Sequence, residues 1–67
     1  MKKRYTLGYT MAATEKVAQD IVKQYSRPDH FISAYAIKKY QPHYTPWTSR
    51  DGKESCFIVW HPVYYYV

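Results

Sequence analysis

Residues 55–67 read SCFIVWHPVYYYV and form the longest apolar segment of the chain. Residues 57–60 are all β-branched or aromatic, and such side chains pack well on a pleated surface. The run is too short to favour a helix. We therefore expect this segment to be the last β-strand and the element around which the fold is built.

An Asp51-Gly52 pair lies just upstream of this segment. Asp-Gly tolerates the positive φ angles of a type I′ turn, and it is a strong hairpin indicator between two apolar runs. The last strand should therefore fold back on the residues before the turn. With this pair at the centre, the predicted partners are Arg50 and Lys53, Trp47 and Cys56, Tyr44 and Val59, His43 and Trp60, and Tyr40 and Val63.

Side chains alternate across a strand, so this register divides the hairpin into two faces. The first face holds Ile32, Ala34, Ala36, Tyr40 and Tyr44 with Phe57, Val59, His61 and Val63. The second holds Phe31, Tyr35, Lys39, His43 and Trp47 with Cys56, Ile58, Trp60, Tyr64 and Tyr66. Both faces are apolar around residues 56–60, whereas a sheet with one wet face alternates cleanly. One helix covers only one face, so the second needs other cover. A bulge at Pro62 would exchange the faces of residues 63–67.

The preceding chain supplies the other elements. Residues 3–9 alternate as a short strand, with Tyr5, Leu7 and Tyr9 on one side. A helix should begin at Thr10 or Thr14 and end near Tyr25, because apolar residues recur there at helical spacing and Pro28 follows.

Residues 30–41 allow two interpretations. Asp29 is able to cap a second helix, but the aromatic and β-branched residues favour a strand, which we expect. Residues 41–49 contain Pro42 and Pro46 and should be irregular or an edge strand. These elements predict an α+β fold in β-α-β-β order, with one helix packed on a mostly antiparallel three-stranded sheet.

Length and composition limit the possibilities. The 67 residues form a single domain (1–67), and a domain this small is marginally stable alone, which favours a homodimer or a partner surface. The single Cys56 excludes an internal disulfide and fits a reducing cytoplasm. No segment approaches the length of a membrane span.

The net charge of +5 favours acidic partners, and nine tyrosines and two tryptophans are typical of an interface.

Catalytic and metal chemistry find little support. His30, His43, His61 and Cys56 lack zinc-site spacing, so we expect no metal and no cofactor. Cys56 lies in an apolar run that disfavours its thiolate, and no close carboxylate pair is indicated. His43, Tyr44 and Arg50 are types that small metal-independent ribonucleases use, but these types are too common to indicate that activity. We expect a protein that is not an enzyme, with no catalytic residues.

An aromatic surface edged with positive charge remains. The candidate binding residues are Tyr35, Lys38, Lys39, His43, Trp47, Arg50, Lys53, Trp60 and Tyr64. Cations follow phosphates and rings stack on bases, so this combination is typical of single-stranded nucleic-acid binding. The same surface would also suit a protein partner, or a homodimer in which two such faces bury each other.

The chain's make-up also resembles that of small bacteriophage accessory proteins, including inhibitors of host nucleases such as anti-CRISPR proteins. This resemblance rests on size and general character and assigns no role to any residue. It implies an alternative partner, an acidic or nucleic-acid-handling protein that this chain binds and blocks. The sequence thus predicts a small basic binding protein for nucleic acid, with an inhibitor or a homodimeric interaction module as alternatives.

Overall fold

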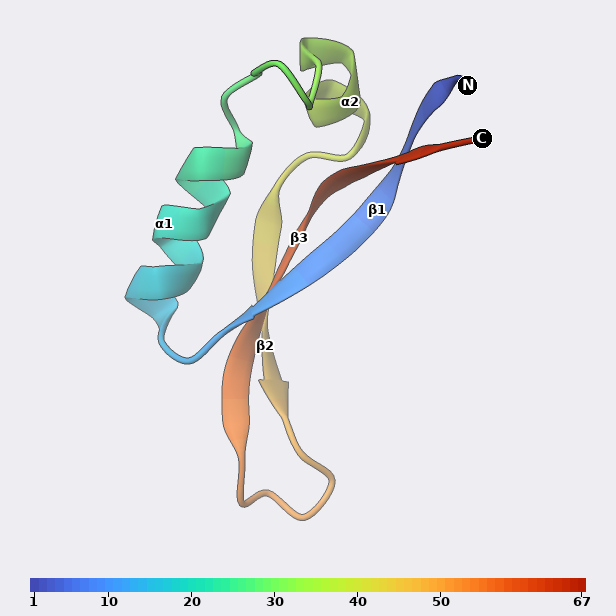
Figure 1. The fold of residues 1–67 in the computed structure, drawn as a ribbon. Coiled ribbons are helices and arrows are strands. Elements are labelled where there is room, and N and C mark those ends of the chain that lie inside the picture. Colours follow the sequence, from blue (N-terminus) through green and yellow to red (C-terminus); the bar gives the residue numbers. More distant parts are fainter.

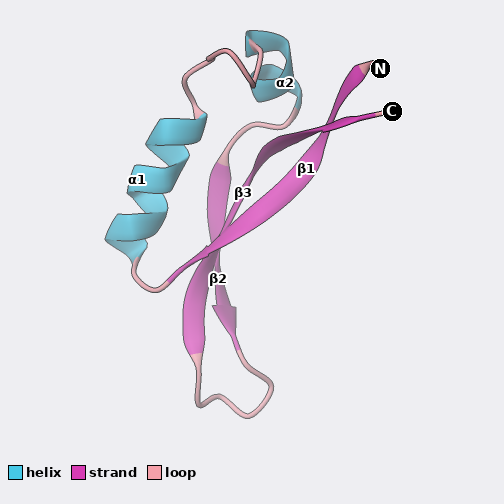
Figure 2. Ribbon diagram, viewed as in Figure 1, coloured by secondary structure: helices cyan, strands magenta, loops and turns pink.

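The computed structural model describes residues 1–67 as three strands and two helices (Figures 1 and 2). In chain order the elements are β1 Lys3–Ala12, α1 Glu15–Tyr25, α2 Ala34–Lys39, β2 His43–Thr48 and β3 Ser55–Tyr66. The strands form one antiparallel sheet in the order β1-β3-β2. The apolar segment at the end of the chain is therefore the central strand, and the fold is α+β with two helices.

Helix α1 lies where its apolar spacing predicts. The Thr14 hydroxyl accepts a hydrogen bond from the backbone N–H of Val17 at 3.3 Å and caps the first turn. Ala18 is completely buried and joins Ala12 and Val59 in the small core. An alanine at the contact lets the helix axis approach β3 closely, which is why Val59 is also completely buried.

The hairpin of β2 and β3 has the predicted register. Trp47 lies opposite Cys56, Tyr44 opposite Val59 and His43 opposite Trp60, which confirms these three pairs. The predicted pair of Tyr40 with Val63 is wrong, because Tyr40 ends α2 and does not belong to a strand.

The predicted type I′ turn is also wrong. Only Gly52 has a positive φ, of 76°, and its N–H donates to the Ser49 carbonyl oxygen at 2.9 Å. The residues before Gly52 therefore make a turn of the type I family, and Gly52 takes the left-handed position that follows it. The Asp51 carboxylate accepts from the Ser49 hydroxyl and the Lys53 N–H. These two hydrogen bonds hold the wider loop without changing the register.

The predicted strand over residues 30–41 is a helix, α2. Asp29 accepts hydrogen bonds from the N–H groups of Phe31 and Ile32, both at 2.8 Å, which bends the chain before any strand can begin. Ser33 then caps α2 by accepting from the Ala36 N–H at 3.3 Å. Of the residues that favour a strand, Phe31 and Ile32 lie in this bend, Tyr35 and Ile37 lie in α2, and Tyr40 ends that helix. The predicted β-α-β-β order is therefore wrong, and the observed order is β-α-α-β-β.

Both prolines in the sheet occupy positions that need no hydrogen-bond donor. Lys2 and Val67 donate a backbone hydrogen bond to each other, and hydrogen-bonded pairs recur at every second residue of an antiparallel ladder. The backbone N–H and C=O groups of odd-numbered β3 residues therefore point toward β1, and those of even-numbered residues point toward β2. Strand β2 begins at His43, opposite Trp60, so the missing N–H of Pro62 faces no strand. Pro46 lies at an outward position on the edge strand β2. Pairing continues through Pro62 without a bulge.

The two faces of the sheet are covered unequally. Helix α1 packs over Val59 and His61, and the Tyr25 ring stacks on His61 with a centroid separation of 3.8 Å. The β1–β3 ribbon twists, as the crossing of these strands in Figure 1 shows, and β3 continues beyond His61 to Tyr66. There Phe31 stacks on Tyr64 of the opposite face, with a centroid separation of 5.7 Å. The three-stranded part of that face remains without a covering helix.

Candidate functional site

The face of the three-stranded region that lies away from α1 carries an uncovered set of apolar and aromatic side chains. Alternation and register place the following residues on it: Leu7, Tyr9 and Met11 of β1, His43, Thr45 and Trp47 of β2, and Cys56, Ile58 and Trp60 of β3. We call this set the open face. Tyr9 is 63% exposed, Met11 52%, Leu7 44% and Trp47 38%. Exposed apolar side chains gathered on one face are the feature of this structure on which a binding proposal rests.

A row of three rings crosses the open face. Tyr9 and His43 both lie directly opposite Trp60, one on each neighbouring strand. The rings of Tyr9 and Trp60 are 5.9 Å apart at an angle of 56°. The Trp60 indole N–H donates to the Thr45 hydroxyl at 3.1 Å, which holds the indole across β2 and β3. The Trp60 ring at the centre of the row is therefore held in place by a hydrogen bond.

The His43 end of this row adjoins a basic depression. Its volume is about 310 Å³, and it is lined by Leu7, Lys38, Lys39, Tyr40, Gln41 and His43. The His43 ring is fixed by its Nδ1 atom, which lies 2.8 Å from the Gln41 carbonyl oxygen. Two lysines from α2 thus stand at the margin of the open face and supply positive charge beside its rings.

No carboxylate lies on the open face. Glu15 and Asp20 belong to α1, Asp29 to the bend before α2, and Asp51 and Glu54 to the hairpin loop. The Glu15 carboxylate is engaged on the far side of the sheet, where it accepts from the Tyr44 hydroxyl at 3.0 Å. Nothing negative on the face would therefore oppose an anionic ligand.

The structure brings together five of the nine predicted binding residues. Trp47, Trp60 and His43 share the open face, and Lys38 with Lys39 borders it. The other four lie elsewhere. Tyr35 is on α2 beside Tyr5 and Tyr65, Tyr64 lies against Phe31, and Arg50 and Lys53 project from the hairpin loop.

The position of Tyr64 has a local cause. The Lys3 ammonium lies 4.8 Å from the centre of the Tyr64 ring and 5.8 Å from that of Phe31. A cation over a ring is attracted by the ring's negative face. The Tyr64 ring is therefore in contact with both the Lys3 ammonium and the Phe31 ring. This cluster ties the N-terminus to the bend before α2 and is a structural contact.

Sequence reasoning missed the contribution of β1. Alternation correctly groups Tyr5, Leu7 and Tyr9 on one side of their strand, and Tyr9 becomes part of the ring row. The missing information was the pairing of β1 with β3, since no turn joins these strands and nothing local sets their register.

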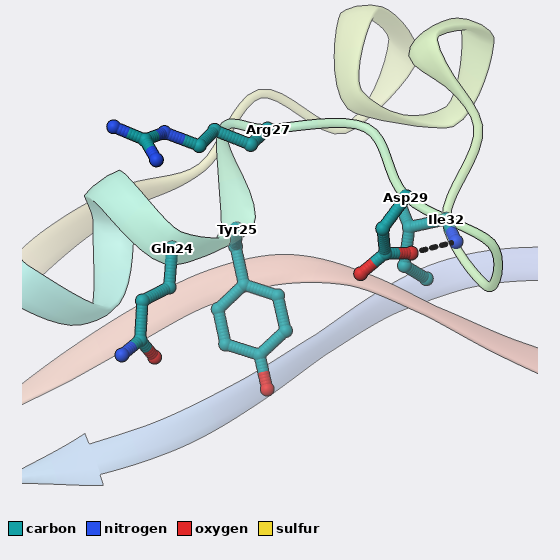
Figure 3. Close-up of a pocket in the computed structure, with 5 residues that line it drawn as sticks. All are labelled: Gln24, Tyr25, Arg27, Asp29 and Ile32. Carbon is teal, nitrogen blue, oxygen red and sulfur yellow. Dashed lines mark hydrogen bonds between the residues drawn. The ribbon is translucent and has the colours of Figure 1, made fainter.

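A pocket between the end of α1 and the bend is lined by Gln24, Tyr25, Arg27, Asp29 and Ile32 (Figure 3). It has a volume of about 200 Å³, and its one carboxylate is Asp29. Backbone hydrogen bonds from Ile32 and Phe31 lower the pKa of Asp29, so the carboxylate is held ionised by its role in the bend. Arg27 points away from Asp29, which leaves the pair unconnected (Figure 3).

The three histidines lie in three different environments. His30 is in the bend, His43 is on the open face, and His61 is buried beneath α1. His61 Nδ1 lies 3.2 Å from the Pro62 carbonyl oxygen, which can only accept, so Nδ1 is assigned as the donor. The other ring nitrogen, Nε2, then accepts from the Thr10 hydroxyl at 2.8 Å. No three residues of metal-ligating type gather where they could hold an ion.

Comparison of the chain with models of protein families, with curated proteins and with solved structures finds no match. Neither helix has the length and apolar character that a membrane crossing requires. The properties of the open face are therefore the basis for a functional proposal.

Proposed function

We propose that this protein is a non-enzymatic binding protein that holds single-stranded nucleic acid on the open face. The observation that supports this proposal is the row of Tyr9, Trp60 and His43 across three adjacent strands. Strands lie about 4.8 Å apart, so neighbouring rings offer successive platforms at a spacing that unstacked bases can match. Every base has a flat π-face, so the expected binding tolerates many sequences.

Charge supports the same ligand. The chain has a net charge of +5, and none of its carboxylates lies on the open face. Lys38 and Lys39 lie beside His43. The phosphates of a nucleic-acid strand whose bases stack on the row would pass close to these two lysines. Each phosphate contact releases condensed counterions, so the affinity should fall with salt by a log–log slope of about −0.7 per contact for a single strand.

Fluorescence anisotropy with a labelled single-stranded oligonucleotide tests this proposal. The double variant Lys38→Glu with Lys39→Glu should weaken binding to all sequences alike and flatten the dependence on salt. The matched control is Lys16→Glu with Lys23→Glu, which makes the same charge change on the exposed side of α1. Equal loss in both double variants would mean that net charge alone drives binding, and the proposed site would then be wrong.

A protein partner is the second candidate, and the aliphatic part of the open face favours it. Leu7, Met11 and Ile58 lie beside the rings, and bases stacked on those rings would not need them. Such side chains suit the buried centre of a protein interface, where aromatic residues act as hot spots. The partner would be an acidic or nucleic-acid-handling protein that this chain blocks. Absence of oligonucleotide binding at low ionic strength would leave this candidate in place.

A further inference from the structure

The outer edge of β1 carries a long row of backbone groups without partners. The exchange between Lys2 and Val67 sets the alternation, so the even-numbered residues of β1 bond to β3. The outward N–H and C=O groups belong to Lys3, Tyr5, Leu7, Tyr9 and Met11. In Figure 1, β1 passes in front of β3 and β2, and no helix or loop covers the side turned toward the viewer.

This edge lacks the protection that edge strands ordinarily have. Short length, prolines, bulges and charges normally prevent a free edge from pairing with another strand. Strand β1 has ten residues, and residues 5–12 include no proline and no charge. The other edge, β2, has only six residues and carries Pro46 at a position whose N–H would point outward. The sheet is therefore open to extension at β1 and protected at β2.

We propose that two copies of this chain pair antiparallel along the outer edges of β1 and form a continuous six-stranded sheet. A two-fold axis near Leu7 would place Leu7 of each copy opposite Leu7 of the other, and Tyr5 of each opposite Tyr9 of the other. Each of the outward-facing residues can then exchange two backbone hydrogen bonds with its counterpart. The edge is self-complementary because both copies present the same unpaired groups.

Charge and core size favour a second copy as the occupant. Antiparallel pairing holds the two basic segments Lys2-Lys3-Arg4 at opposite ends of the new interface, roughly 30 Å apart for strands of this length. Only 7 of the 67 residues are buried, so a single copy has little core of its own. Pairing adds cross-strand contacts of Tyr5 with Tyr9 and of Leu7 with Leu7, which stabilise neighbouring strands.

Edge pairing differs from a dimer in which two open faces cover each other. It leaves both ring rows accessible and places them on one side of a wider sheet. It does not depend on the proposed nucleic-acid binding, since the unpaired groups belong to the backbone. A monomer could still bind single-stranded nucleic acid, and a dimer could form even if the protein binds no nucleic acid. The two proposals can therefore fail separately.

Chemical synthesis of this short chain allows a test that leaves every side chain unchanged. N-methylation of Leu7 removes one outward donor, and the two-fold axis makes the loss occur in both copies. The matched control is N-methylation of Tyr44, whose N–H points outward from the protected edge of β2. Sedimentation equilibrium should give the unmodified chain about twice the mass of one 8.1 kDa chain. The Leu7 change should raise the dimer dissociation constant by about tenfold or more, and the Tyr44 change should leave it unaltered.

Amide hydrogen exchange gives a second readout that needs no variant. The amides of Leu7 and Tyr9 should be protected at millimolar concentration and exchange rapidly on dilution. Those of Gly8 and Thr10, which bond to β3, should remain protected throughout. A monomer at every accessible concentration, or rapid exchange of Leu7 and Tyr9 in a dimer, would overturn the proposal. A dimer that dissociates on Ile58→Lys but tolerates N-methylation of Leu7 would show face-to-face association instead.

Discussion

Gly8→Ala should destabilise the protein through a single contact across the β1–β3 ribbon. A Cβ atom at position 8 would lie 2.6 Å from Val63 Cγ1 and 3.0 Å from Cγ2, so the valine side chain must move. Gly8 pairs with His61, one row from Tyr9 opposite Trp60, so the contact also tests the register that builds the ring row.

The magnitude follows from two opposing effects. Overpacking costs about 1–3 kcal/mol, and replacing glycine by alanine in a strand returns about 0.5–1 kcal/mol by restricting the unfolded chain. Val63 is half-buried and able to yield in part, so we expect a net loss of about 1–2 kcal/mol in the free energy of unfolding. In a Val63→Ala background the clash is absent, and Gly8→Ala should be neutral or slightly stabilising.

Urea unfolding followed by tryptophan fluorescence measures the four proteins of this double-mutant cycle. The expected coupling free energy between positions 8 and 63 is about 1–3 kcal/mol. Gly52→Ala is the matched control, because Gly52 has a positive φ of 76° and no atom within 4 Å of an added Cβ. Its cost should arise from the backbone alone and add to that of Val63→Ala. A coupling below about 0.5 kcal/mol between positions 8 and 63 would refute the assigned β1–β3 register.

Three further outcomes follow from individual contacts. Backbone N–H donors hold the pKa of Asp29 below its ordinary value of 3.8 in the folded chain. The unfolded chain therefore protonates the Asp29 carboxylate more readily, and the stability due to this carboxylate is lost as the pH falls below about 4. Asp29→Asn keeps the acceptor oxygen but does not titrate, so its urea midpoint should change less over that pH range. Ser33→Ala removes the cap of α2 and should cost about 1 kcal/mol in urea unfolding, whereas Ser33→Asp should preserve most of the stability. Cys56 is free and half-buried on the open face, so its reaction with a thiol reagent should slow when oligonucleotide is bound, and an unchanged rate would argue against binding there.

Local patterns predicted those parts of the fold that local contacts determine. The Asp51-Gly52 pair fixed the register of β2 with β3, even though the turn takes another form, because the strands are joined by that turn. The apolar repeat predicted α1 because its buried stripe has helical spacing. In residues 30–41, β-propensity was misleading because the Asp29 and Ser33 side chains, acting on nearby N–H groups, set the local structure.

Long-range pairing was beyond the sequence patterns. Tyr9 and Trp60 are 51 positions apart, and no turn or repeat relates β1 to β3. The face was therefore predicted from β2 and β3 alone. The register confirms that Trp47, Trp60 and His43 share one face, whereas Tyr9 of β1 was not expected there. Tyr35 was included because residues 30–41 were expected to form a strand that continued the face, and α2 replaces that strand. Tyr64 was included because it alternates with Trp60 on β3, but its ring lies against Phe31.

Intrinsic fluorescence tests the proposed use of the open face most directly. Trp47 and Trp60 are the only tryptophans, and both lie on that face, so each reports its occupation without a label. Titration with a single-stranded oligonucleotide at low ionic strength should quench both single-tryptophan variants, Trp47→Phe and Trp60→Phe. Trp60→Ala should lose about 1–3 kcal/mol of binding free energy for each base that no longer stacks, while the slope with salt stays the same. Binding detected by anisotropy with neither tryptophan quenched, or no binding at all, would contradict nucleic-acid recognition by this face.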